Sequence, residues 1–197
     1  MKRLHPVKID DATYYEKIWG DEHKLHPFFD AVRMRGLIRD VKNGDKVLDV
    51  GAGVFGSCQF IATQTEIEAE LHCVDQSHTA KELIEKDCPQ IHFTVAAFEP
   101  PETLLPFKDG EFDLVTAGEI IEHMEDPEAF AKELCRVGKN VALSTVDTRC
   151  ENAIKHGDYP EHLWEFDPKD LIQFFLPYGE VEYTTVGDYH FIYCRCR

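Results

Sequence analysis

The chain has 197 residues, 43% hydrophobic and 29% charged, which is the balance of a globular protein and enough for one domain with its own core. Its 37 acidic and 21 basic residues give a formal net charge of −16, and such a field repels nucleic acid, whose binding depends on basic contacts to phosphates. No stretch approaches the roughly 20 apolar residues of a membrane span, and residues 1–6 lack the apolar run of a secretory signal. We therefore expect one domain that works without nucleic acid or membrane.

The seven cysteines favour a reducing compartment. No two of them have C-x-x-C spacing, and their number is odd. Several lie in apolar segments, where a free cysteine behaves as a small hydrophobic residue. The sequence therefore predicts neither a zinc site nor a disulfide framework, and it predicts a cytoplasmic location.

Two segments with helical periodicity open the chain, at residues 10–19 and 27–38. In the second segment the apolar residues share one side, so Arg33 and Arg35 are expected to face outward.

Residues 47–56, Val-Leu-Asp-Val-Gly-Ala-Gly-Val-Phe-Gly, organise the rest of the sequence. An apolar run at 46–50 predicts a buried strand, and three glycines spaced G-x-G-x-x-G follow it. This spacing between a strand and a helix is typical of a loop that holds a nucleotide-like cofactor. Asp49 lies two residues before the first glycine, where a dinucleotide-binding strand keeps an apolar residue. A carboxylate there suits a cationic ligand better than a pyrophosphate, which disfavours a nucleotide-dependent oxidoreductase.

Strands and helices alternate after this loop. Asp126 followed by Pro127 indicates a helix that runs to about Val137, because the two residues form an N-cap and a first-turn proline. Further strands are predicted at 70–74, 91–95, 112–116 and 140–145, helices at 55–65, 77–86 and 168–176, a loop at 147–165 and a hairpin at 180–186 and 190–196. The fold class is α/β: a doubly wound, Rossmann-like sheet of about seven strands with a C-terminal antiparallel hairpin and helices on both faces.

The motifs resemble those of the class I S-adenosylmethionine (SAM) dependent methyltransferases. Similar to that family are the glycine loop, Leu71-His-Cys-Val-Asp75, residues 105–115, Glu122-His123 and Glu133-Leu-Cys-Arg-Val137. They cover roughly residues 40–150 in the family's order, and they look like the type 11/25 domains of small-molecule and ubiquinone- or menaquinone-biosynthesis methyltransferases.

The resemblance implies one methyltransferase domain over 1–197, with SAM as cofactor and a small-molecule acceptor. Residues 1–40 would form helices that cover the site, 41–146 the SAM-binding core, and 147–197 a substrate-side loop, helix and hairpin. The acceptor atom (oxygen, nitrogen or carbon) stays open, as does the choice between monomer and homodimer.

The expected cofactor contacts follow the family's motifs. Asp49 would hold the SAM amino group, and Asp75, 22 residues after Gly53, the ribose hydroxyls. The predicted cofactor-binding residues are Asp49, Gly51, Ala52, Gly53, Asp75, Gln76, Phe98 and Glu119. After the third strand the family's small residue and aspartate are replaced by Val95-Ala-Ala-Phe-Glu99, where Phe98 would stack on adenine. This departure keeps a non-catalytic, methyltransferase-like scaffold domain as an alternative.

Glu119, Glu122 and His123 are spaced i, i+3 and i+4, so one helical turn would place them on one face. His123 is the candidate general base for a hydroxyl acceptor. Together with His162, the same residues resemble the metal site of small-RNA 2′-O-methyltransferases, whose ligands suit Mn²⁺ or Mg²⁺. Because the charge opposes RNA and His162-Leu-Trp-Glu-Phe also matches metal-free relatives, we predict no metal. Predicted substrate contacts are Tyr14, Tyr15, Trp19, Glu122, Tyr159, His162 and Trp164.

Overall fold

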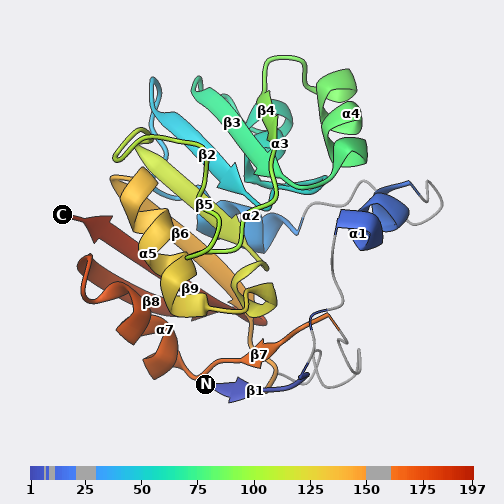
Figure 1. The fold of residues 1–197 in the computed structure, drawn as a ribbon. Coiled ribbons are helices and arrows are strands. Elements are labelled where there is room, and N and C mark those ends of the chain that lie inside the picture. Colours follow the sequence, from blue (N-terminus) through green and yellow to red (C-terminus); the bar gives the residue numbers. More distant parts are fainter. Residues whose placement is uncertain (7, 9–11, 21–29, 150–160) are drawn as a thin grey trace.

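The protein's structure is a computed structural model that describes residues 1–6, 8, 12–20, 30–149 and 161–197. Its centre is a seven-stranded sheet with the order β4-β3-β2-β5-β6-β9-β8 (Figure 1). The elements are β1 (Lys2–Arg3), α1 (Ala12–Trp19), α2 (Ala31–Leu37), β2 (Lys46–Val50), α3 (Ser57–Gln64), β3 (Glu70–Asp75), α4 (His78–Asp87), β4 (His92–Val95), β5 (Leu114–Gly118), the 3-10 turn η1 (Ile121–His123), α5 (Pro127–Val137), β6 (Asn140–Val146), β7 (Trp164–Glu165), α7 (Pro168–Phe175), β8 (Gly179–Val186) and β9 (Tyr189–Cys196).

The predicted fold class is confirmed. Strands β4, β3, β2, β5 and β6 are parallel, and β9 joins β6 antiparallel before pairing with β8 in the terminal hairpin. Helices cover both faces: α2, α3 and α4 pack over one core cluster, α5 and α7 over the other (Figure 1). Within the described residues, no helix is long and apolar enough to cross a membrane.

Two local predictions are wrong. Strand β5 runs over Leu114–Gly118 rather than 112–116. Phe112 instead forms an isolated bridge with Gly138: its amide donates to the Val137 carbonyl, and its carbonyl accepts from the Lys139 amide. Residues 147–165 were expected to be loop, yet Trp164 and Glu165 pair with Arg3 and Lys2 in a small second sheet. That pairing joins segments about 160 residues apart, which no local pattern signals.

A buried charge pair holds the 99–110 segment on α5. The Glu133 side chain is 3% exposed, and its Oε1 accepts from the Leu105 amide at 2.7 Å. The Arg136 guanidinium donates to both oxygens of this carboxylate, at 2.8 and 2.7 Å, and to the carbonyls of Leu105 and Phe107. Arg136 therefore neutralises a carboxylate that would otherwise be buried without a cation.

Replacing this arginine should destabilise the fold. We expect Arg136→Met to lower the free energy of unfolding by about 3 kcal/mol, because it leaves Glu133 charged and buried. Arg195→Met is the matched control: Arg195 and its partner Glu180 are both exposed, so its cost should stay within about 0.5 kcal/mol. Urea unfolding measures both, and equal costs would contradict this account.

Candidate functional site

A cavity of about 720 Å³ lies at the carboxyl ends of the parallel strands. Its walls come from the glycine loop after β2, the segments that follow β3, β4 and β5, and helices α1 and α2. Ligands of open α/β sheets bind at this edge, and the volume is in the range of small-molecule pockets. The topology therefore brings the predicted loop and the predicted lid to one place.

The glycine loop is shaped by close contacts. Gly51 has φ +66°, and a Cβ there would stand 2.1 Å from Cδ1 of Ile120. Gly56 begins α3, and a Cβ there would stand 2.3 Å from Oδ2 of Asp49. The glycines thus serve the protein's own packing as well as any ligand that lies on the loop.

Asp75 ends β3 and holds the loop. Its Oδ2 accepts from the Gly53 amide at 2.9 Å and its Oδ1 from the Ser77 amide at 2.9 Å. Burial raises the pKa of this carboxyl, while the two amides oppose the rise. Each carboxylate oxygen keeps a further lone pair, so Asp75 can still accept from a ligand's hydroxyls.

Asp49 is buried where β2 ends and lies on the cavity wall. Its Oδ1 accepts from the Thr116 hydroxyl at 3.0 Å, and its Oδ2 from the Cys58 amide at 3.3 Å. These bonds tie β2 to β5 and to the first turn of α3. Burial raises the pKa of Asp49. Its predicted contact with the SAM amino group stays a prediction.

Gln76 and the segment after β4 form another part of the wall. The Phe98 ring lies 6.1 Å from that of Phe130 and nearly parallel to it, which supports Phe98 from behind. Glu99 accepts from Lys8 Nζ at 2.5 Å and from the Glu125 amide at 2.8 Å. Glu99 therefore joins the N-terminal segment to the segment after η1.

Helix α1 closes the cavity over the loop. Tyr14, Tyr15 and Trp19 all line it, and Trp19 covers Gly53, where an added Cβ would stand 2.7 Å from Cζ2 of the indole. Glu16 anchors the helix at the N-terminus of α4: its carboxylate accepts from the Thr79 amide at 3.0 Å and from the Thr79 hydroxyl. Figure 1 shows α1 beside α4, apart from the main layers.

Arg33 does not face outward, so that prediction is wrong. It lies on the cavity wall near Glu119, and within the described residues its buried Nε has no hydrogen-bond partner. Its guanidinium lies 5.9 Å from the centre of the Tyr189 ring. A signal existed in the sequence: Arg33 precedes the buried Leu37 by four residues and so shares its face of the helix.

Glu119 lies on the wall, but not on a helical turn. Its φ is +57°, and helical geometry begins only at η1, so the prediction of one helical face for Glu119, Glu122 and His123 is wrong. The backbone turns here because the Glu119 amide donates to the Ser144 carbonyl as β5 ends. Burial raises the pKa of Glu119 to about 7, and the charge of Arg33 opposes the rise.

His123 and His162 meet on the cavity wall although they lie on different segments. Their rings are 4.9 Å apart and nearly perpendicular. The Glu122 carboxylate lies beside them: one ligand atom from each of the three residues lies within 4.8 Å of the other two. Glu122 is 1% exposed, and within the described residues neither carboxylate oxygen has a hydrogen-bond partner.

Two predicted substrate residues, Glu122 and Trp164, are not among the described residues that line the cavity. Glu122, on η1, is buried beside the histidines. Trp164 also lies outside the wall: its Nε1 donates to the Met124 carbonyl at 2.8 Å, and its ring packs against Arg3. Their predicted contacts with a substrate stay predictions. Tyr159 lies outside the described residues.

Comparisons with known proteins agree with this geometry. Residues 48–143 match the family model of a methyltransferase domain. The chain is 30% identical to the chloroplastic tocopherol O-methyltransferase of Arabidopsis thaliana, over 85% of this chain and 56% of that protein. Residues 48–143 form a class I SAM-dependent methyltransferase domain.

Other methyltransferases resemble the chain over part of its sequence or in its fold. Norajmaline N-methyltransferase of Rauvolfia serpentina is 35% identical over 55% of this chain and 37% of that protein. A SAM-dependent methyltransferase structure from Aquifex aeolicus superposes with a TM-score of 0.68 at 18% identity, over 94% of this chain and 98% of that one. The chain spans about half the length, or less, of the two curated relatives.

The buried carboxyl of Glu119 should make the stability of this protein depend on pH. Between pH 4.5 and about 7 the unfolded chain has lost the Glu119 proton while the folded chain retains it, so this group's contribution to stability falls as the pH rises. Between pH 4.5 and pH 8, we expect the free energy of unfolding of Glu119→Gln to rise by about 2–3 kcal/mol relative to that of the unchanged protein.

Urea unfolding at both pH values measures that gain, and exposed Glu102 supplies the control Glu102→Gln. If Glu119→Gln and the unchanged protein differ in free energy of unfolding by the same amount at both pH values, the pKa of Glu119 is not raised.

Proposed function

We propose that this chain transfers the methyl group of SAM to a small-molecule acceptor. One observation carries the proposal: a single cavity joins the glycine loop and Asp75 at one part of its wall to His123, His162 and the aromatic residues of α1 at another. Such a cavity has room for a cofactor and an acceptor side by side.

The residues of the loop fit the cofactor. Asp49, Asp75 and Glu119 make this part of the wall acidic, which suits a ligand that carries a sulfonium and an ammonium group. In this proposal the lone pairs of Asp75 bind the ribose hydroxyls, Gln76 and Phe98 flank the adenine, and the backbone at 51–53 borders the methionine part. SAM, when bound, would supply a methyl group on a sulfonium: the nucleophile would bond to the methyl carbon as the carbon–sulfur bond breaks, with S-adenosylhomocysteine as the leaving group.

The protein's part in such a displacement is alignment and the exclusion of water. Helix α1 covers the loop, and Trp19 seals it at Gly53. His123 is the general base of the proposal for a hydroxyl acceptor: an imidazole nitrogen takes the proton as the acceptor oxygen forms its bond to the methyl carbon. An amine or carbon acceptor does not require this step.

The wall that remains for the acceptor is largely aromatic. Tyr14, Tyr15 and Ile18 line it beside the histidines, so we propose an acceptor with an apolar body and a reactive polar group. The printed names of the relatives include a tocopherol O-methyltransferase and an alkaloid N-methyltransferase, which supports this class. Action as a monomer or homodimer in the cytoplasm stays a prediction.

A metal-dependent variant of the reaction has one observation in its favour, the grouping of Glu122, His123 and His162. In the RNA 2′-O-methyltransferase alternative these donors would hold Mn²⁺ or Mg²⁺. The net charge of −16 opposes an RNA acceptor. We therefore propose the metal-free reaction, and assays with Mn²⁺ and with EDTA distinguish the two.

Cofactor binding is the first test. Calorimetric titration should give micromolar dissociation constants for SAM and S-adenosylhomocysteine. Asp75→Ala should weaken both about 10- to 100-fold, because charge-assisted hydrogen bonds to the ribose are worth about 1.5–3 kcal/mol. Exposed Asp87 at the end of α4 supplies the control Asp87→Ala. If neither compound binds the unchanged protein, the scaffold alternative replaces this proposal.

Turnover is the second test, with a panel of phenols, alcohols and amines of apolar body. For a hydroxyl acceptor, His123→Asn should lower kcat about 10²- to 10⁴-fold and leave S-adenosylhomocysteine binding unchanged, because only proton transfer is lost. Exposed His92 on β4 supplies the control His92→Asn. Full kcat in His123→Asn would remove the base from the mechanism.

A further inference from the structure

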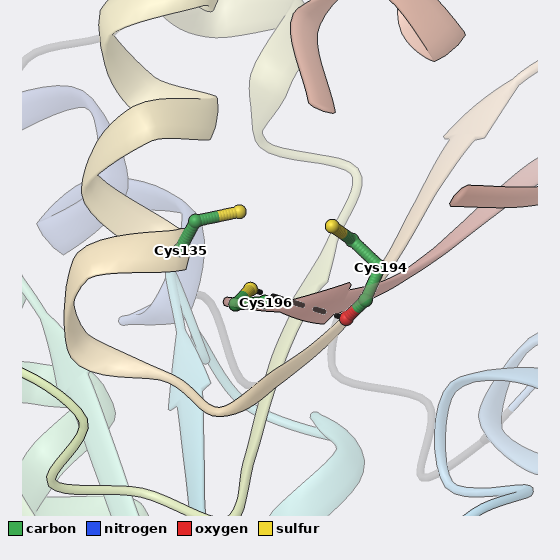
Figure 2. Close-up of side chains that lie close together, drawn as sticks. All are labelled: Cys135, Cys194 and Cys196. Carbon is green, nitrogen blue, oxygen red and sulfur yellow. Dashed lines mark hydrogen bonds between the residues drawn. The ribbon is translucent and has the colours of Figure 1, made fainter. Parts of the chain in front are cut away.

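Three cysteines converge on the face of the sheet that α5 covers (Figure 2). Cys194 and Cys196 are two residues apart on β9, so both side chains lie on the same face of the strand. Cys135, on the last turns of α5, points toward them (Figure 2). The three Sγ atoms all lie within 4.8 Å of one another.

This cysteine cluster is separate from the cavity. Cys194 pairs with Val141 at the start of β6, whereas the cavity lies at the carboxyl ends of the parallel strands. None of the three cysteines lines the cavity. The cluster therefore lies at the opposite end of β6, and the proposed methyl transfer does not explain it.

Access from solvent distinguishes the cluster from ordinary buried thiols. Cys58 and Cys73 also lie close together, but both are fully buried, and burial raises the pKa of each thiol. In the cluster, Cys135 and Cys196 are partly exposed, so an ion can reach the sulfurs from solvent. Within the cluster, Cys196 Sγ donates to the Cys194 carbonyl at 4.0 Å, and Cys194 Sγ donates to the Phe175 carbonyl at 3.9 Å.

The spacing of the sulfurs is close to that of a metal site. With metal–sulfur bonds of about 2.3 Å, three ligand sulfurs stand about 3.8–4.0 Å apart in tetrahedral or trigonal geometry. Sulfurs that already lie within 4.8 Å reach this separation by small side-chain rotations. The donors are all soft, and within the described residues no histidine or carboxylate belongs to the cluster.

We propose that Cys135, Cys194 and Cys196 form a trithiolate site for a thiophilic d¹⁰ metal ion, monovalent copper or zinc. Three sulfurs complete the trigonal geometry of copper, whereas zinc takes a fourth ligand from solvent. Binding releases the thiol protons and joins the end of α5 to the last strand. The ion therefore stabilises the folded chain in proportion to its affinity.

The test uses the full-length protein, reduced and kept free of oxygen. Cu⁺ and, separately, Zn²⁺ are titrated in competition with a chromophoric chelator of known affinity. We expect one equivalent per chain to be retained, with thiolate-to-metal charge-transfer absorption for Cu⁺ and a higher melting temperature. Retention of one ion alone assigns the site to that ion.

Variants locate the site. Cys135→Ala and Cys196→Ala, at partly exposed positions, should each lower the affinity at least tenfold and abolish the thermal shift. Cys88→Ala removes a buried cysteine outside the cluster and should change neither. S-adenosylhomocysteine binding at the other end of the sheet, or the melting temperature without metal, reports that each variant is folded.

Two outcomes would overturn the site. In the first, the protein retains no metal, or the unchanged protein and Cys135→Ala retain the same amount. The other is a disulfide between two of the three cysteines in protein isolated in air, found by peptide mass spectrometry, with no metal retained after reduction. That result would make the cluster a redox pair instead.

Discussion

The hydrogen bond from the Gly53 amide to Asp75 is the constraint on which the cavity depends. It joins the glycine loop after β2 to the end of β3, and Asp49 joins the same region to β5 and to the start of α3. Both carboxyls are buried, which raises the pKa of each. The free-energy cost of burying the two carboxylates is offset because backbone amides and a hydroxyl donate to their oxygens. The same oxygens retain lone pairs that can face a cationic ligand.

The remaining walls depend on contacts between distant segments. Glu16 fastens α1 to the N-terminus of α4, which brings Trp19 over Gly53. The histidines meet because the Leu163 amide donates to the Glu122 carbonyl at 2.8 Å, which draws the segment after the undescribed residues 150–160 against η1. The cofactor end of the cavity is thus built on the sheet edge, and the acceptor end is assembled from segments laid over it.

The two ends of the sheet carry different chemistry. Oxygen and imidazole groups gather at the carboxyl ends of the parallel strands, where loops can vary without disturbing the core. Sulfur gathers at the other end, where β9 runs antiparallel to β6 and its last residues face α5. The hairpin that completes the sheet therefore also creates the cysteine cluster.

The sequence alone determined the fold class, the glycine loop and the two carboxylates that follow β2 and β3, because these depend on local periodicity and on residues next to a strand. It also indicated α1 as part of the wall. Only the tertiary structure decided that Arg33 faces the cavity and that Glu119 leaves helical geometry. It also decided that Glu122 and Trp164 lie outside the cavity wall, and that Cys135 meets Cys194 and Cys196. Each of these depends on which surfaces pack together, and a pattern along one chain does not contain that information.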